Sequence, residues 1–164
     1  MSKLIMMIGV PGSGKSTWVE NNKTDEMLWV SRDKIRFDKL KEDDYYFAYE
    51  DEVFEQFLEE ITWGLEMDKT VIADATHLNK QSRARVLDKV RKFADEIEAV
   101  WIDVPIETAF SQNDKREGRA WVKHGIIRRM WFTLEAPEFD EGFDKITRVR
   151  KGLTTIARKE KEDI

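Results

Sequence analysis

A glycine-rich run near the start of the chain constrains its fold more than any other feature. The run spans residues 9–17 and reads GVPGSGKST, which fits the pattern GxxxxGK[ST]. It directly follows the apolar stretch Leu4–Ile8. A loop of this kind binds phosphate only when it joins a buried strand to the N-terminus of a helix. We therefore expect an α/β fold in which the first strand leads into a phosphate-binding loop.

The residues of this loop have separate expected roles. Its glycines let backbone N–H groups converge on a β-phosphate, and Lys15 can reach the β- and γ-phosphates. The Ser16 hydroxyl can hold Mg²⁺. The sequence thus predicts a nucleoside triphosphate site, with ATP as phosphate donor and Mg²⁺ as cofactor. The expected nucleotide contacts in the loop are Gly12, Ser13, Gly14, Lys15, Ser16 and Thr17.

Length and composition indicate one globular domain. The chain has 164 residues, of which 41% are hydrophobic and 37% charged. It has no apolar stretch long enough to cross a bilayer, and it enters its first strand at once. We expect no signal peptide, no membrane partner and a cytoplasmic location. Zero cysteines, with His77 and His124 as the two histidines, exclude disulfides and disfavour a zinc site.

The net charge of −5 conceals an uneven distribution of charge. Residues 42–60 hold nine acidic residues and no basic ones, so the rest of the chain has a net charge of +4. The segment from Ser111 to Met130 contains six basic residues and two acidic ones. The sequence therefore predicts a local basic surface that is compatible with a nucleic acid partner.

Hydrophobic patterns alternate between strand and helix, which predicts a single P-loop NTPase-like domain with a parallel sheet of about five strands and helices on both faces. Strands are expected at Leu4–Ile8, Met27–Ser31, Thr70–Ala73, Val100–Val104 and Ile146–Val149. Helices are expected at Lys15–Asn21, Asp43–Leu65, Asn79–Ala94, Ile106–Arg116 and Val122–Leu134. The segment Leu153–Ile164 is expected to form a charged C-terminal helix.

The end of the second expected strand carries the most informative residues outside the loop. Residues 31–36 read SRDKIR. Because the carboxyl ends of parallel strands form one crevice, Asp33 should face the bound phosphates and accept a proton from an attacking hydroxyl. Arg36 lies on the same helical face and could clamp a phosphate. The alternative is that Asp33 is a helix N-cap with an incidental arginine partner.

The third expected strand ends in Asp74. A carboxylate at this position can orient a Mg²⁺-bound water or hydrogen-bond the acceptor, so we include Asp74 among the substrate-binding candidates. Helix capping is again the alternative. His77 is interpreted as a structural or surface histidine rather than a base, because Asp33 already has the geometry for that role.

A basic segment between two expected helices, about residues 111–122, indicates a helical lid. Residues 112–121 read QNDKREGRAW, with a central glycine. Such a lid can bring arginines over bound phosphates. Arg116 is the first candidate for stabilising charge on the transferring phosphoryl group, and Arg119 is the second. Trp121 could stack on a base or pack within the lid.

Five elements in order, GVPGSGKSTW, SRDKIR, DATHLN, Asp103-Val104-Pro105 and the basic lid, carry a resemblance. This series resembles the kinase domain of phage-type polynucleotide 5′-hydroxyl kinases, which phosphorylate DNA or RNA ends. The resemblance covers nearly the whole chain. It implies that Asp33 is the general base, that Arg36 contacts an acceptor phosphate and that Arg116 engages the donor phosphates.

The chain departs from the family at three points. Gln112 stands where the phage enzyme has a further lid arginine, so Arg119 or Lys115 would have to supply that charge. Asp74 sits one place earlier relative to the following threonine, which leaves its role less defined than that of Asp33. The phosphatase domain that follows the kinase in the phage enzyme has no counterpart, because the sequence has no DxDxT motif. We expect no 3′-phosphatase activity.

The sequence therefore predicts a kinase that transfers the ATP γ-phosphate to the 5′-hydroxyl of DNA or RNA, with Asp33, Lys15 and Arg116 as catalytic residues. Two alternatives remain open. One is a kinase of a small metabolite, a nucleoside or a sugar nucleotide. The other is a nucleotide-dependent switch without transfer activity. The run Asn22–Asp25 matches the guanine-reading pattern NKxD, but its position just after the loop helix indicates a helix end and a turn.

Overall fold

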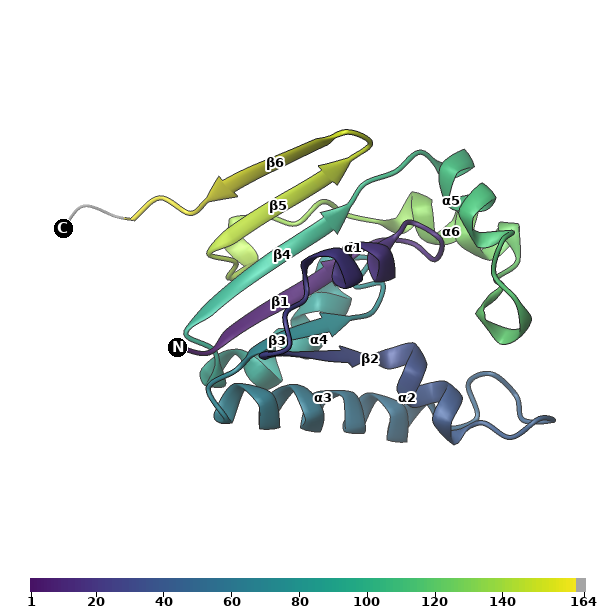
Figure 1. Ribbon diagram of the computed structural model, residues 1–164, viewed down its shortest axis with the longest axis horizontal. Coiled ribbons are helices and arrows are strands. Elements are labelled where there is room, and N and C mark those ends of the chain that lie inside the picture. The colour runs from purple at the N-terminus through teal and green to yellow at the C-terminus, as the bar shows by residue number, and fades with distance from the viewer. Residues whose placement is uncertain (162–164) are drawn as a thin grey trace.

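A computed structural model of the protein, which describes residues 1–161, is built on one six-stranded sheet with the strand order β2-β3-β1-β4-β5-β6 (Figure 1). The first five strands in the chain run parallel, and β6 runs antiparallel to β5. The strands are β1 (Lys3–Ile8), β2 (Met27–Ser31), β3 (Thr70–Asp74), β4 (Glu96–Ile102), β5 (Lys145–Arg150) and β6 (Leu153–Arg158). The predicted α/β fold class is confirmed.

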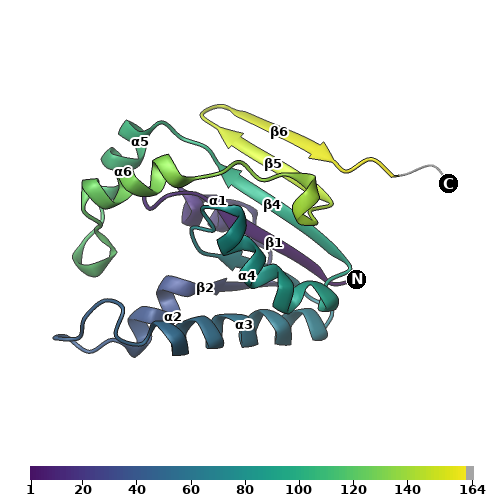
Figure 2. The same cartoon turned by 180° about the vertical axis from the view of Figure 1, so that it is seen from behind.

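Helices cover both faces of the sheet. α1 lies on one face, and α3 and α4 lie on the other (Figures 1 and 2). The helices are α1 (Lys15–Asn22), α2 (Arg32–Lys39), α3 (Glu50–Glu66), α4 (Lys80–Val90), α5 (Ile106–Asn113) and α6 (His124–Thr133). Three short 3₁₀ helices are η1 (Arg91–Phe93), η2 (Gly118–Ala120) and η3 (Phe139–Glu141). No helix within residues 1–161 combines the length and apolar character that a bilayer crossing requires.

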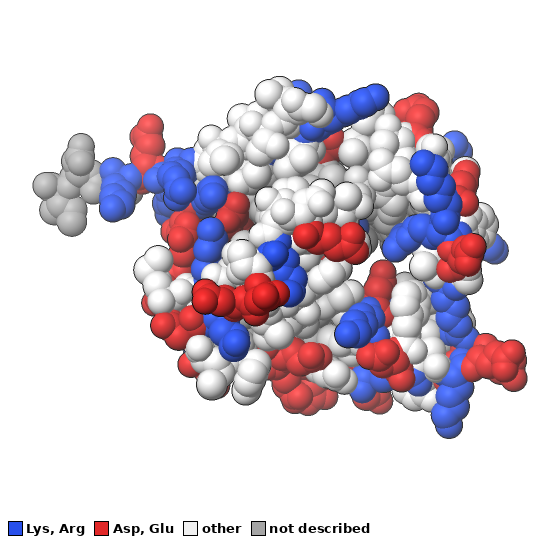
Figure 3. Space-filling view, in the orientation of Figure 1, with Lys and Arg blue, Asp and Glu red and all other residues white. Residues whose placement is uncertain are grey.

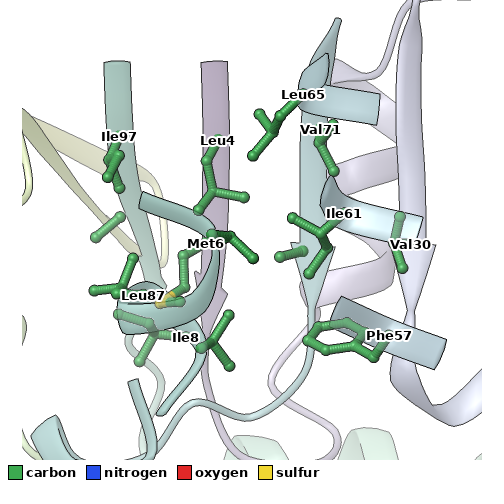
Figure 4. Packing of buried hydrophobic residues seen from close by; sticks show 14 of the residues in the cluster. Leu4, Met6, Ile8, Val30, Phe57, Ile61, Leu65, Val71, Leu87 and Ile97 are labelled. Carbon is green, nitrogen blue, oxygen red and sulfur yellow. The ribbon is translucent and has the colours of Figure 1, made fainter. Parts of the chain in front are cut away.

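The unbroken apolar run of β1 follows from burial on both sides. Leu4, Met6 and Ile8 point toward the face covered by α3 and α4, where they pack with Phe57, Ile61 and Leu87 (Figure 4). Ile5 and Met7 point to the opposite face and pack with Val19 of α1. A central parallel strand has no solvent face, so its sequence does not alternate. The core on both faces therefore fixes the position of the loop that follows β1.

The expected helix Asp43–Leu65 is wrong in its first part, because α3 begins at Glu50. Residues 40–49 form a loop instead. Lys41 N donates to the Asp44 carboxylate at 2.8 Å, which makes a side-chain turn that competes with a helix. Tyr46 is held by a tertiary hydrogen bond from its hydroxyl to Asp33, at 3.1 Å. This loop projects beside α2 (Figure 1).

The expected C-terminal helix Leu153–Ile164 is also wrong, because residues 153–158 form β6. Gly152 has a φ of 73°, which permits the tight turn from β5. The β-branched residues Thr154, Thr155 and Ile156 suit a strand, and β5 offers a free edge. The sheet therefore has six strands rather than about five. Residues 162–164 of the expected helix lie outside the described residues.

Candidate active site

The phosphate-binding loop lies between β1 and α1, as its pattern predicted. Gly12 and Gly14 have φ values of 81° and 106°, a left-handed conformation that glycine adopts without strain. The Lys15 ammonium folds over the loop and donates to the carbonyls of Gly9 and Val10, at 2.9 and 3.1 Å. Ser16 and Thr17 are exposed in the first turn of α1. The loop thus presents its lysine, a hydroxyl and a helix N-terminus at one point.

Gly12 also joins the loop to α5, the helix that carries the lid. A Cβ atom at Gly12 would lie 2.4 Å from the Ala109 carbonyl oxygen and 3.0 Å from Asn113. Both contacts involve backbone atoms or side-chain atoms close to the backbone. The loop and the stem of the lid therefore touch with no room for a side chain.

This contact predicts a large effect of Gly12→Ala. The new methyl group would push α5 off the loop. Alanine would also be strained by the left-handed φ at position 12. We expect a loss of about 1–3 kcal/mol in the free energy of unfolding and at least tenfold weaker nucleotide binding. Denaturant titration and equilibrium binding measure the two effects. The control is Gly152→Ala, which has a φ of 73° but no atom within 4 Å of its Cβ. Equal destabilisation by both changes would rule out the packing explanation.

Four charged side chains act on one another at the carboxyl edge of the sheet. Burial lowers the pKa of Lys15, while the negative charges of Asp74 and Asp33 raise it and the positive charge of Arg116 lowers it further. Burial raises the pKa of Asp74, and the charges of Lys15 and Arg116 oppose that shift. The fold thus brings together these four residues, which come from separate parts of the sequence.

Asp74 lies at the end of β3, opposite Ser31 of β2. Its side chain is 7% exposed and accepts a hydrogen bond from Trp29 Nε1 at 3.0 Å. The capping alternative does not describe Asp74, because Asn79 caps the next helix. The sequence did not predict Trp29 as a hydrogen-bond partner of Asp74.

Asp33 lies in the first turn of α2, where Ser31 supplies the N-cap by accepting from Lys34 N at 3.2 Å. The interpretation of Asp33 as the cap is therefore wrong. Its side chain is 51% exposed. Asp33 Oδ1 accepts hydrogen bonds from Arg36 Nη1 and from the Tyr46 hydroxyl, whereas Oδ2 accepts none from residues 1–161. An ordered carboxylate with one open oxygen is suited to receive a proton.

Arg36 lies beneath Asp33 rather than on the surface. It is 6% exposed, and its Nη2 donates to Glu50 Oε1 and Oε2 at 2.9 and 3.0 Å. Arg32 also donates to Glu50, at 2.6 Å. A bidentate pair of this kind fixes the guanidinium plane. The contact of Arg36 with an acceptor phosphate stays a prediction, while the geometry shows Arg36 holding Asp33.

Tyr46 completes the support of Asp33. Burial, with the nearby Asp33 charge, raises the pKa of Tyr46 to about 12. The hydroxyl therefore stays protonated and can donate a hydrogen bond to Asp33. The Arg36 guanidinium lies 4.7 Å from the centre of the Tyr46 ring. The sequence did not predict that Tyr46 and Glu50 support Asp33 and Arg36. Three adjacent aromatic residues, 45–47, inside an otherwise acidic segment were the available signal.

The lid begins where α5 ends. Asn113 Nδ2 donates to the Val122 carbonyl at 2.7 Å, and Val122 N donates to Asn113 Oδ1 at 3.0 Å. These bonds close the base of a loop whose tip is η2 (Figure 2). Trp121 packs within this lid, and its Nε1 donates to Asp114 at 3.3 Å. The lid is therefore helical at its stem and at its tip.

Arg119 does not lie over the phosphate-binding loop. Its Nη2 donates to the carbonyls of Lys41 and Glu42, at 2.8 and 2.7 Å, so the tip of the lid rests on the 40–49 loop. The positive charge of Arg116 lowers the pKa values of Lys15 and Asp74. The ranking of Arg116 before Arg119 for the donor phosphates stays a prediction.

His77 is structural, as interpreted from the sequence. It is 4% exposed, and its Nδ1 lies 2.7 Å from the Met7 carbonyl oxygen, so Nδ1 carries the proton. Nε2 is buried and has no hydrogen-bond partner within residues 1–161. Burial lowers the pKa of His77 to about 4, which keeps the ring neutral.

The lowered pKa of His77 predicts a loss of stability in mild acid. The unfolded chain binds a proton at His77 near pH 6.5 and the folded chain only near pH 4, so stability falls as the pH decreases between these values. From pH 7 to pH 5 the expected loss is about 2 kcal/mol. Denaturant titrations should show this loss in the wild type and in His124→Asn, but not in His77→Asn. An unchanged loss in His77→Asn would contradict the assignment.

The residues present fit a magnesium ion that arrives with the nucleotide. Within residues 1–161, no group of three His, Cys, Asp or Glu side chains is arranged to hold a metal ion alone. Mg²⁺ usually keeps several waters and takes its other ligands from phosphate oxygens and one or two side chains. Exposed Ser16, beside Lys15, and the nearby Asp74 carboxylate suit that kind of site.

The residues of this site lie within a segment that matches a known protein family. A family model described as an AAA domain matches residues 4–137, which include the phosphate-binding loop, Asp33, Asp74 and the lid. The chain belongs to this AAA-domain family. Its fold, with the phosphate-binding loop between β1 and α1, is that of P-loop kinases.

Solved structures share the fold of this domain. A chain of the Pnkp1/Rnl/Hen1 RNA repair complex is 25% identical and has a TM-score of 0.72, over 81% of this chain and 44% of that chain. A sugar kinase from Janibacter sp. is 19% identical and has a TM-score of 0.63, over 93% of this chain and 87% of that chain. The α/β kinase fold and the resemblance to polynucleotide kinases are both confirmed.

A further relative is the transcription factor bHLH140 of Arabidopsis thaliana, which is 25% identical over 151 residues. The matched residues make up 87% of this chain but 15% of that protein. The chain therefore spans less than half the length of both this relative and the matching RNA repair chain.

Proposed function

We propose that the protein is a polynucleotide kinase, which transfers the γ-phosphate of ATP to the 5′-hydroxyl end of DNA or RNA. One observation carries the proposal. A cavity of about 340 Å³ lies between the 40–49 loop and the lid, one helical turn along α2 from Asp33. Its lining residues are Phe37, Leu40, Lys41, Glu42, Glu117, Arg119 and Ala120. An open space there lets a chain extend away from the carboxylate, whereas a small metabolite needs a closed pocket.

Charge is distributed in a way that suits this acceptor. Basic side chains lie over the lid and the β5–β6 turn, while acidic side chains lie over α3 (Figure 3). Phosphates supply most of the affinity of proteins for nucleic acid. The acidic surface would repel a polynucleotide from α3 and leave the edge that bears the site accessible.

The proposed reaction uses the side chains already described. Asp33 Oδ2 takes the proton of the 5′-hydroxyl, the hydroxyl oxygen bonds to the γ-phosphorus, and the bond from this phosphorus to the β–γ bridging oxygen breaks to release ADP. Lys15 and the loop N–H groups hold the β- and γ-phosphates, and Arg116 balances charge on the transferring group. A magnesium ion at Ser16 would offset phosphate charge. Arg36, Glu50 and Tyr46 hold Asp33 in place.

The resemblance to a sugar kinase fold keeps a metabolite kinase as the second candidate. A panel of acceptors separates the two. We expect kcat/KM to rise at least tenfold from a free nucleoside to a 5′-hydroxyl oligonucleotide, because the longer chain fills the space beneath the lid. A nucleoside or a sugar that matches or exceeds the oligonucleotide would favour the metabolite kinase.

A nucleotide-dependent switch is less well supported. Asn22 ends α1, and Met27 N donates to the Thr24 carbonyl at 3.1 Å, so the NKxD-like run is a helix end and a turn. A switch also gives no role to the half-exposed Asp33. ATP turnover that no hydroxyl acceptor stimulates would favour the switch.

A further inference from the structure

Two aromatic side chains are exposed on the loop that supports the carboxylate we assign as the base. Tyr45 is 72% exposed and Phe47 is 50% exposed, and both lie in the 40–49 loop. Rings of this size dominate binding energies when they are covered, and apolar surface left open next to a site is often functional. Neither ring belongs to the hydrophobic clusters that form the core of the described residues.

The two rings are ordered relative to Asp33. Phe47 packs edge-to-face on Tyr46, with ring centres 4.7 Å apart, and Tyr45 packs on Phe47 at 5.7 Å. Tyr46 in turn donates its hydroxyl hydrogen to Asp33 Oδ1. The lid also steadies this loop through the two hydrogen bonds of Arg119. The exposed rings are therefore a pre-arranged surface at a set distance from the base, rather than free side chains.

Charge restricts what can lie on this surface. The loop carries Glu42, Asp43 and Asp44 against the single basic residue Lys41, so its net charge of −2 disfavours a phosphate backbone. The opposite wall of the cavity belongs to the lid, where Arg119 and Glu117 both line it. Residues 111–122 hold three basic and two acidic side chains, so the lid is weakly basic. The rings of Tyr45 and Phe47 lie in the loop that forms one wall of this cavity but do not line it. A nucleotide whose phosphate lies against Arg119 of the lid would therefore have to reach past the cavity to place its base on the rings.

We propose that Tyr45 and Phe47 form a stacking surface for the nucleobase at the 5′ end of the acceptor. This inference rests on the proposed polynucleotide kinase function and deepens it. Stacking on aromatic rings tolerates any base, because every base has a π-face. The surface would therefore favour nucleic acid ends over sugars without selecting a sequence.

The test pairs protein variants with two acceptors. One acceptor is a 5′-hydroxyl oligonucleotide, and the other is the same oligonucleotide with an abasic 5′-terminal nucleotide. Phe47→Leu and Tyr45→Leu should each raise the KM of the normal acceptor about 5- to 100-fold, with kcat little changed. Neither variant should raise the KM of the abasic acceptor, because no base remains to stack. Phe47→Trp should retain the wild-type KM.

Matched controls separate stacking from general damage. Phe132→Leu removes another ring that is 72% exposed, on α6, and should leave both KM values unchanged. A rise in KM that is equal for the two acceptors, or no rise at all, would overturn the stacking surface while leaving the kinase function intact. If the wild type labels no oligonucleotide, the kinase proposal fails, and the stacking surface fails with it.

Discussion

Asp33→Asn should lower phosphoryl transfer by about 10²- to 10⁴-fold, the usual contribution of a general base. Asparagine has nearly the same shape and can still accept the hydrogen bond from Tyr46, so the loop should stay in place. It cannot take up the proton of an attacking hydroxyl. Nucleotide affinity should change by less than about threefold, because Lys15 and the loop N–H groups remain. Initial rates with labelled ATP and equilibrium nucleotide binding measure the two quantities.

The control for this substitution is Asp38→Asn. Asp38 lies on the same helix and is exposed, and no role is assigned to it. It should retain wild-type transfer. If Asp33→Asn loses nucleotide binding and transfer together while its fold is intact, Asp33 belongs to the donor site and is not the base.

Arg83→Met should cost about 3–5 kcal/mol of the free energy of unfolding. Arg83 is fully buried, and its Nε and Nη2 donate to the Glu141 carboxylate at 2.7 and 3.1 Å. Its Nη1 donates to the carbonyls of His77 and Glu135, at 2.9 and 3.0 Å. Removing the guanidinium leaves Glu141 buried without its partner. Denaturant titration measures the loss.

Two further variants test the cause of that loss. Arg85→Met removes an exposed arginine from the same helix, where it lies over the Phe54 ring, and should cost less than about 1 kcal/mol. Adding Glu141→Gln to Arg83→Met should restore part of the stability, because the unpaired charge is then gone. A double variant as unstable as Arg83→Met would show that lost packing, not the buried charge, dominates.

The parts of the fold that depend on local pattern could be predicted from the sequence. The loop between β1 and α1 has a fixed spacing, and the buried strands have apolar runs that place Asp33 and Asp74 at one edge of the sheet. The prediction of a C-terminal helix was wrong because the charged residues of that segment resemble those of a surface helix. Its strand depends on pairing with β5, which local composition does not show.

The support of Asp33 could not be predicted for a similar reason. Arg36 and Glu50 lie on different helices, α2 and α3. They pair only because residues 40–49 form a loop between these helices and do not extend α3. Most acidic side chains of α3 are exposed. Glu50, at its first turn, is instead half-buried and forms ion pairs with both Arg32 and Arg36.

The most direct test of the central claim follows the label from γ-labelled ATP. The wild-type protein, with Mg²⁺, is given short DNA and RNA strands that carry either a 5′-hydroxyl or a 5′-phosphate. Digestion of the products to mononucleotides then locates the label. We expect label only in the 5′-terminal nucleotide of the 5′-hydroxyl strands. Label on no strand, from a folded protein that binds ATP, would contradict the polynucleotide kinase function.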